Sequence, residues 1–280
     1  MLARMLAVAL VLFLAFDAAP PRAELITRPP PPVEVAVRPG VTVKYLALSP
    51  KNRPRDAVIL FAGGNGLLNL QPNGSIGYLS GNFLVRSRDR FVQQNLFVAV
   101  VDTPNQVAID GNVRLSAQYA EDMSRVIADV RKRARAEKVW LVGTSAGTIS
   151  AASVAARLPR LMPSSNNDNL RRPDGIVLTA TQSTLVKGLC GRTVFNAQLA
   201  AVNVPAFLAH HAEDGCKCSP MSAVGKVLAA LTGAPAKGSR KFSGGPPPKS
   251  PDPCMAMTPH GFLGIEDSVV EAIAEFVQKH

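Results

Sequence analysis

The chain has 280 residues and a formal net charge of +11 at pH 7. This length suits one domain with a large core, and the sequence contains no internal repeat and no separable second domain. The densest positive cluster is Arg131, Lys132, Arg133 and Arg135. It lies at the end of a predicted helix, where cations complement the helix dipole and face water. No aromatic-interleaved basic motif accompanies it, so the sequence does not indicate nucleic-acid binding.

The first residues have the pattern of an export signal. A short basic start precedes an apolar run from Met5 to Phe16 that is too short to span a bilayer, and small residues and prolines follow it. We therefore interpret residues 1–23 as a secretory signal cleaved between Ala18 and Ala23, which leaves a net charge of +10. An uncleaved membrane anchor is the alternative. This interpretation predicts a periplasmic or secreted domain over residues 24–280, without a membrane span after cleavage.

Eight segments are predicted to be strands. The first two alternate in polarity around a Pro39-Gly40 turn and predict an antiparallel hairpin, and the later ones are mostly continuous apolar runs separated by helical patterns. This order predicts an α/β fold with a mostly parallel eight-stranded sheet and helices on both faces. Trp140 is expected in the core, and residues 67–90 are expected to form a long loop between the third and fourth strands. The strands are residues 33–37, 41–48, 57–61, 97–102, 139–142, 175–180, 205–210 and 240–243.

The most informative stretch runs from Lys138 to Ile149. It reads as a buried strand, then Gly143-x-Ser145-x-Gly147, then a helix of small residues that is expected to end before Pro159. A serine at a sharp strand-to-helix turn exposes its hydroxyl beside a helix N-terminus, and the flanking glycines leave room for the strained backbone. A glycine-rich turn whose serine only caps the helix is the alternative.

This stretch resembles the nucleophile elbow of the α/β-hydrolase family. The order of the elements along the whole chain is also that of the family. Local similarity is greatest to the dienelactone hydrolase and prolyl-oligopeptidase-like branches, around the elbow, a His-x-x-x-Asp motif and a His-Gly-Phe motif. The resemblance implies that Ser145 is a nucleophile.

The resemblance also implies a base and an acid downstream of the serine. His260, in the loop before the terminal helix, stands where the family places its base. Asp214 matches the acid of the His-x-x-x-Asp motif that begins at His210 and is expected to orient the imidazole. Glu213 is the alternative acid, whereas Asp102 is expected to cap a turn or a helix.

The oxyanion hole is expected to use two backbone amides. One is the N–H of Ala146, the residue after the nucleophile. The other is expected in the glycine-rich loop after the strand at 57–61, and we favour Asn65, then Gly64. The histidine that usually starts this motif in the family is replaced here by Phe61 or Ala62.

Four cysteines follow predicted strand ends on the same side of the sheet: Cys190, Cys216, Cys218 and Cys254. In an oxidising compartment they suggest two disulfides with three possible pairings. A bond between Cys216 and Cys218 would be strained, so each is expected to reach a different loop and to tie the acid and base loops together. The alternative is a metal site of Cys216, Cys218, His210 and His211, which we do not expect, because adjacent strand residues face opposite sides.

These features together predict a secreted serine hydrolase that cleaves an ester or related acyl bond of a small molecule without a cofactor. Arg86 and Arg88 are candidates for binding an anionic acyl group. The alternatives are a binding protein that kept the scaffold and lost turnover, and an acyltransferase or peptidase with the same triad. The sequence does not indicate an oligomeric state.

Overall fold

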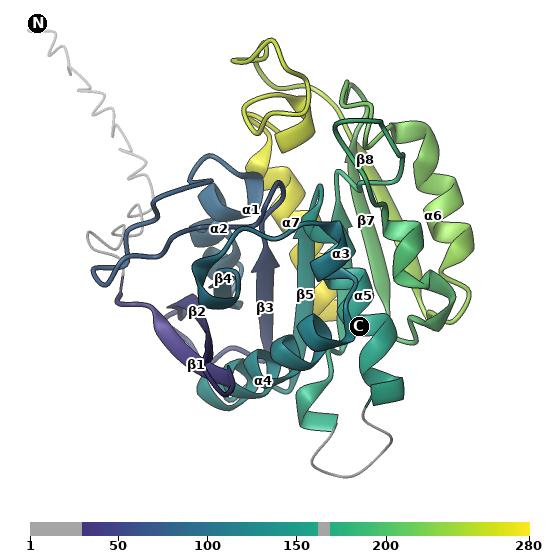
Figure 1. Ribbon diagram of the computed structural model, residues 1–280. Helices are drawn as coiled ribbons and strands as arrows, with labels where there is room; N and C mark the ends of the chain where they lie inside the picture. Colours follow the sequence, from purple (N-terminus) through teal and green to yellow (C-terminus); the bar gives the residue numbers. More distant parts are fainter. Residues whose placement is uncertain (1–29, 162–168) are drawn as a thin grey trace, which may run out of the picture.

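The computed structural model describes residues 30–161 and 169–280, so the predicted signal segment lies outside the described residues. The described residues form one eight-stranded sheet in the order β1-β2-β4-β3-β5-β6-β7-β8 (Figure 1). β2 pairs antiparallel with β1 and with β4, and all the other pairs are parallel. The strands are β1 Val33–Arg38, β2 Val41–Leu48, β3 Asp56–Phe61, β4 Phe97–Val101, β5 Lys138–Thr144, β6 Gly175–Thr179, β7 Ala206–His211 and β8 Lys237–Phe242.

Helices cover both faces of the sheet, as predicted (Figure 1). One core cluster joins the sheet to α4, α5 and α6, and a second joins it to α1, α2 and α7. The helices are α1 Phe83–Arg86, α2 Arg88–Gln93, α3 Gly111–Arg114, α4 Ala117–Ala134, α5 Gly147–Leu161, α6 Val224–Ala230 and α7 Glu266–Lys279.

The strand sequences explain why the sheet is buried on both sides. Along β3, Val58 and Leu60 enter one cluster, while Ile59 and Phe61 enter the other. All four are at most 2% exposed, as expected for a central parallel strand whose successive side chains point to opposite faces. Trp140 on β5 is fully buried, which confirms the predicted core position.

Two local predictions need correction. The helix after the elbow was expected to end before Pro159, but α5 continues through Pro159 to Leu161. Proline is tolerated there because it lies in the last turn, where its missing N–H removes a single helical hydrogen bond. The segment between β3 and β4, expected to be a loop, contains the short helices α1 and α2, whose buried side chains pack under the sheet.

The parallel strands bring the chain's candidate residues to one edge. Loops that leave the carboxyl ends of β3, β5 and β7 meet there, and the segment between β8 and α7 lies over the same edge, at the top of Figure 1. This is the edge at which open α/β sheets bind ligands. Within the described residues, no helix is long and apolar enough to cross a membrane.

Two glycine substitutions test the packing of the elbow. A Cβ on Gly147 would come closer than 3.0 Å to the carbonyl oxygens of Phe61 and Ala62, whereas a Cβ on Gly225 in α6 would meet nothing within 4 Å. Gly147→Ala is therefore expected to lower the free energy of unfolding by about 1–3 kcal/mol. Gly225→Ala is expected to raise it by about 0.4–1 kcal/mol. Urea unfolding measures both, and equal effects would contradict this packing.

Candidate active site

Ser145 occupies the sharp turn between β5 and α5. Its φ is 52°, in the left-handed region that non-glycine residues rarely adopt, at a cost of about 1–3 kcal/mol. Neighbouring groups hold it there: the Ser145 N–H donates to the Thr179 carbonyl (3.0 Å), and the Ser145 carbonyl accepts from the Thr148 N–H (3.0 Å). Ser145 is partly exposed, so its side chain is accessible at the turn.

The glycines of the motif are needed for close approach. A Cβ on Gly143 would come closer than 3.0 Å to the backbone of Gly147. Across the turn, a Cβ on Gly63 would lie 2.9 Å from the Ser145 Cβ. The loop after β3 therefore packs directly against the serine, as the sequence predicted for an oxyanion loop.

The predicted base and acid are in contact. The His260 Nδ1 lies 2.9 Å from Asp214 Oδ2 and 3.2 Å from Asp214 Oδ1. The Asp214 side chain is fully buried, and only 5% of the His260 side chain is exposed. His260 lies in a single turn of 3₁₀ helix, Pro259–Gly261, that the Thr258 hydroxyl caps by accepting the His260 N–H. A carboxylate at Nδ1 leaves Nε2 as the ring nitrogen that can accept a proton.

Asp214 is ionised in the folded protein. Burial alone would raise the pKa of this carboxyl, but contacts with His210 and His260 and the Cys216 N–H (2.9 Å from Oδ1) outweigh burial. The pKa of Asp214 is consequently well below its ordinary value. The carboxylate is therefore available to orient the His260 ring and to stabilise its protonated form.

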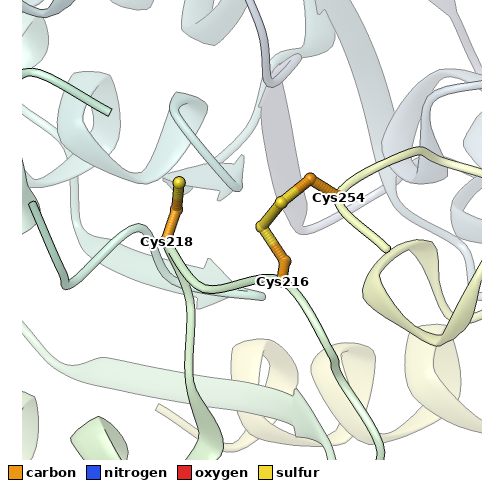
Figure 2. A group of neighbouring side chains, drawn as sticks. All are labelled: Cys216, Cys218 and Cys254. Carbon is orange, nitrogen blue, oxygen red and sulfur yellow. A yellow bond between two sulfur atoms is a disulfide. The ribbon is translucent and has the colours of Figure 1, made fainter. Parts of the chain in front are cut away.

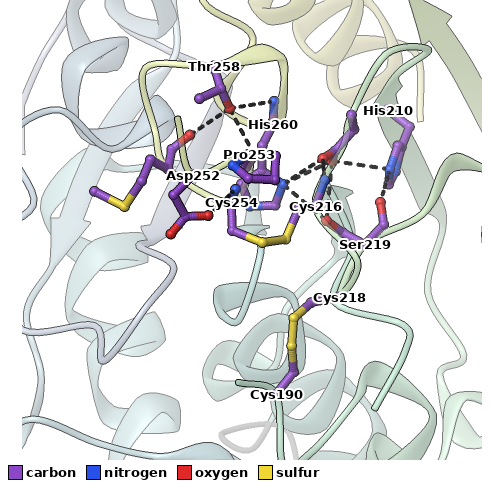
Figure 3. The surroundings of a disulfide bond; sticks show 12 residues. Cys190, His210, Cys216, Cys218, Ser219, Asp252, Pro253, Cys254, Thr258 and His260 are labelled. Carbon is purple, nitrogen blue, oxygen red and sulfur yellow. Dashed lines mark hydrogen bonds and ion pairs between the residues drawn. A yellow bond between two sulfur atoms is a disulfide. The ribbon is translucent and has the colours of Figure 1, made fainter. Parts of the chain in front are cut away.

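Two further side chains complete this group, and sequence reasoning missed both. The Ser219 hydroxyl, which is fully buried, lies 3.0 Å from His260 Nδ1 and donates to Asp214 Oδ2 (3.2 Å). The Ser219 carbonyl lies 2.7 Å from His210 Nε2, which is also 3.5 Å from Asp214 Oδ2 (Figure 3). A lone serine after a cysteine carries no sequence signal for this role, and His210 was considered only as the start of a motif and as a ligand of the alternative metal site.

Ser145 and His260 face the same cavity, of about 550 Å³. No hydrogen bond joins the Ser145 hydroxyl to the His260 ring among the described residues; such contacts commonly tighten only when substrate binds. Much of the cavity wall is apolar and comes from two segments, around α1 and before His260. Its apolar side chains are Leu79, Phe83, Met255 and Met257.

The three predicted oxyanion amides lie beside the serine. Gly64 lines the cavity that holds Ser145, and Gly64, Asn65 and Ala146 together line an adjoining cavity of about 450 Å³. Within residues 30–161 and 169–280, none of these three amides donates to a protein acceptor. Free amides at this place are what an oxyanion hole requires.

The alternative acids lie elsewhere. Glu213 is exposed, and the His260 ring contacts Asp214 rather than Glu213. Asp102 accepts the N–H groups of Leu68 and Leu70 (2.8 and 3.0 Å) and so caps the turn after β3, the role that the sequence analysis expected for it.

Arg86 and Arg88, the candidates for binding an anionic acyl group, do not line the cavity that contains Ser145, and both make other contacts. Arg86 forms an ion pair with Glu266 (2.8 Å) and donates to the carbonyls of Gly81 (2.6 Å) and Gly261 (2.5 Å). Arg88 donates to the Val85 carbonyl (2.7 Å). Arg86 therefore stabilises the loop that carries His260 through the Gly261 carbonyl. The sequence alone does not distinguish an arginine in this role from one at the surface.

The cysteines pair as Cys216–Cys254 and Cys190–Cys218 (Figure 3). As predicted, Cys216 and Cys218 reach different loops. Cys216 follows Asp214 by two residues and Cys254 precedes His260 by six, so the first bond joins the acid loop to the base loop. Cys218 lies beside this bond (Figure 2). With all four thiols paired and His211 bonded to the Gly244 carbonyl (3.0 Å), the metal alternative is not supported.

No known protein-family profile matches the chain, and no curated protein sequence does. Solved structures do. Est1E from Butyrivibrio proteoclasticus has 13% sequence identity and a TM-score of 0.57, over 89% of this chain and 98% of that one. DcsB, solved with a substrate analogue, has 13% identity and a TM-score of 0.59 over 89% and 98%. The esterase Est2 from Thermogutta terrifontis, solved with butyrate, has 16% identity and a TM-score of 0.56 over 89% and 94%.

At these identities the similarity establishes the fold. The chain has the α/β-hydrolase fold, with the mostly parallel eight-stranded sheet and the helical layers that the sequence predicted. The neighbours with this fold include proteins described as esterases and as serine hydrolases.

The low pKa of Asp214 predicts an acid-dependent loss of stability. Because the folded pKa lies below the unfolded value of about 3.9, the carboxylate stabilises the fold above that pH, and this contribution is lost as the pH falls through the folded pKa. The unfolding free energy of the wild type is expected to fall more steeply than that of Asp214→Asn below about pH 4. Chemical unfolding at a series of pH values measures both slopes, and parallel slopes would contradict the prediction.

Removing one disulfide at a time distinguishes the effect of each bond on stability from its effect on activity. The bonds close loops with sequence separations of 38 and 28 residues, so chain entropy predicts a similar loss of about 4 kcal/mol for each. Cys216→Ala/Cys254→Ala is expected to reduce any Ser145-dependent turnover more than Cys190→Ala/Cys218→Ala, because only the first bond joins the acid and base loops. Thermal unfolding and turnover of both double variants make the comparison. Equal losses of turnover at equal stability would refute the assigned role.

Proposed function

We propose that this protein is a serine hydrolase that cleaves an ester or related acyl bond, with Ser145 as nucleophile, His260 as base and Asp214 as acid. The observation that carries the proposal is the convergence of two distant segments. A serine with strained backbone and a histidine paired to a buried carboxylate face one cavity, although 115 residues separate them in the sequence. A serine and a histidine–carboxylate pair on one cavity are the groups that nucleophilic catalysis by a hydroxyl requires.

The proposed reaction has two halves. The Ser145 Oγ attacks the carbonyl carbon while its proton moves to His260 Nε2, and the resulting oxyanion accepts hydrogen bonds from the Ala146 and Asn65 or Gly64 amides. The bond to the leaving alcohol then breaks, and the alcohol oxygen takes the proton from His260. In the second half, water gives a proton to His260 and its oxygen attacks the acyl carbon. The bond between that carbon and Ser145 Oγ then breaks, Oγ takes the proton from His260, and the acid leaves.

The cavity indicates a small substrate with an apolar group. Its volume of about 550 Å³ suits a small-molecule ligand, and the methionines, leucine and phenylalanine of its wall favour an aliphatic or aromatic substituent. Lys249 also lines the cavity. It is exposed, so its cationic group is accessible to solvent.

Export to an oxidising compartment accompanies this proposal. The first 23 residues have the pattern of a secretory signal, and the two disulfides beside the site fit an oxidising environment. The net charge of +10 that remains after cleavage favours attraction to anionic surfaces.

Covalent labelling tests the nucleophile. A fluorophosphonate probe reacts with activated serines, so the wild type is expected to be labelled and Ser145→Ala is expected not to be. Thr148→Ser is the control. Thr148 lies in α5, the helix that follows Ser145, and its hydroxyl donates to the Ser145 carbonyl without taking part in the proposed chemistry. Absence of labelling in the wild type would favour a binding protein without turnover and would reject the proposal.

Kinetics with chromogenic esters distinguish the remaining alternatives. A series of p-nitrophenyl esters from acetate to octanoate, with an anilide as the amide control, is expected to show Ser145-dependent hydrolysis of the esters. The anilide is expected to react at least ~100-fold more slowly, a factor that corresponds to about 2.7 kcal/mol. Faster cleavage of the anilide would indicate a peptidase, and product transfer to an added alcohol in preference to water would indicate an acyltransferase.

A further inference from the structure

A buried arginine lies behind the loop that contains the expected oxyanion amides. Arg114, the last residue of α3, is only 2% exposed, although arginine is rarely buried without a charged partner. No carboxylate lies within 4.0 Å of its guanidinium in the part of the chain that the structure describes, and its Nε has no hydrogen-bond partner there. Burial lowers the pKa of Arg114, and Tyr119 and Asp110 partly offset the effect.

Arg114 instead binds neutral oxygens of two elements that form the site. Its Nη1 donates to the Ser150 hydroxyl (2.7 Å), on the helix that begins beside Ser145. Its Nη2 donates to the carbonyls of Gly64 (3.0 Å) and Ala62 (3.4 Å), in the loop after β3. The guanidinium thus ties the loop after β3 to the helix after the nucleophile.

These contacts fix the direction of the loop amides. In a planar trans peptide the carbonyl and the N–H of the next residue point in opposite directions. Because the Gly64 carbonyl points to Arg114, the Asn65 N–H points away from it. The other carbonyls of the loop are also bound, that of Gly63 by the Gly66 N–H (3.1 Å) and that of Asn65 by the Ile109 N–H (3.0 Å).

Gly66 makes room for this arrangement. Its φ is +74°, and a Cβ there would lie 2.8 Å from Arg114 Nη2. The loop therefore presents bound carbonyls on the side of the guanidinium, while the Gly64 and Asn65 amides have no protein acceptor among the described residues.

We propose that Arg114 is a positioning residue that holds the Gly64–Asn65 peptide so that the loop amides serve as oxyanion donors, and that its buried positive charge favours the oxyanion. A buried cation without a carboxylate partner is costly to a fold, and an oxyanion held by the amides of the adjoining loop would offset part of that cost only in the transition state. The inference rests on the proposed hydrolase function and adds a residue that does not itself touch substrate.

Two variants and a matched control test the role on turnover. Arg114→Met removes the charge and the contacts, and it is expected to lower kcat about 10- to 100-fold, below the loss of ~10²–10³-fold for a whole oxyanion donor. Arg114→Lys keeps the charge, but one ammonium group cannot donate to the Ser150 hydroxyl and to both loop carbonyls as the planar guanidinium does. Its kcat is therefore expected to fall about tenfold. KM is expected to change less than about threefold in both, since the interaction strengthens only in the transition state.

Arg131→Met is the control because Arg131 also binds backbone carbonyls, those of Glu137 and Arg172, at the opposite edge of the sheet. It is expected to lose stability and to keep kcat within about twofold of the wild type.

An alkyl boronic acid, which forms a tetrahedral adduct with the serine, is expected to bind Arg114→Met and Arg114→Lys more weakly by the same factors as kcat. If Arg114→Met does not fold, the Arg114→Lys variant tests the proposal instead. A folded Arg114→Lys variant whose kcat and boronate affinity are both within twofold of the wild type overturns the proposal.

A readout that needs no turnover separates this inference from the proposed function. The Asn65 amide resonance in ¹H–¹⁵N spectra is expected to shift in Arg114→Lys and to stay in place in Arg131→Met. If the wild type shows no Ser145-dependent turnover, the hydrolase function fails, and the shift alone still decides whether Arg114 positions the loop. An unchanged Asn65 resonance in Arg114→Lys overturns it.

Discussion

The left-handed backbone of Ser145 is the constraint on which the site depends. A residue with φ of 52° is stable only when its neighbours leave no alternative, and here three contacts remove the alternatives. Its N–H is bound to β6, its carbonyl is bound to the first turn of α5, and the loop after β3 packs against its Cβ. The loop after β3 also contains the Gly64 and Asn65 amides, so the geometry of Ser145 and that of this loop are set together.

The scaffold could be predicted because its determinants are local. Continuous apolar runs mark buried parallel strands, and Gly143, Ser145 and Gly147, between a predicted strand and a predicted helix of small residues, mark a sharp turn. His260 and Asp214, which the sequence analysis expected to act together, lie in contact in the structure, and their order along the chain after Ser145 is what suggested the pair. The short spacing between Cys216 and Cys218 argued against a bond between them and left two possible pairings. The structure has one of these two, Cys216–Cys254 with Cys190–Cys218.

The side chains that support the site could not be predicted. Ser219, Arg86 and Arg114 act through contacts with residues that lie 41, 175 and 50 positions away, and nothing near them in the sequence distinguishes them from ordinary loop or surface residues. Arg86 was assigned to the substrate because a positive charge near a pocket suggests an anion. Its actual partners are Glu266 and backbone carbonyls of the base loop. Sequence patterns report periodicity and spacing, whereas these roles depend on which loops fold back over the sheet.

The disulfide between the acid and base loops has a practical consequence for handling the protein. Residues 243–265, which include His260, contain no α-helix or strand, so covalent bonding substitutes there for the regular backbone pairing that orders the rest of the chain. Material made in a reducing cytoplasm would lack the stabilisation of both bonds, and its histidine loop would lack the covalent link to the loop of Asp214. Recombinant protein should therefore be produced in an oxidising host compartment, and its thiol content should be titrated before any lack of activity is ascribed to the sequence.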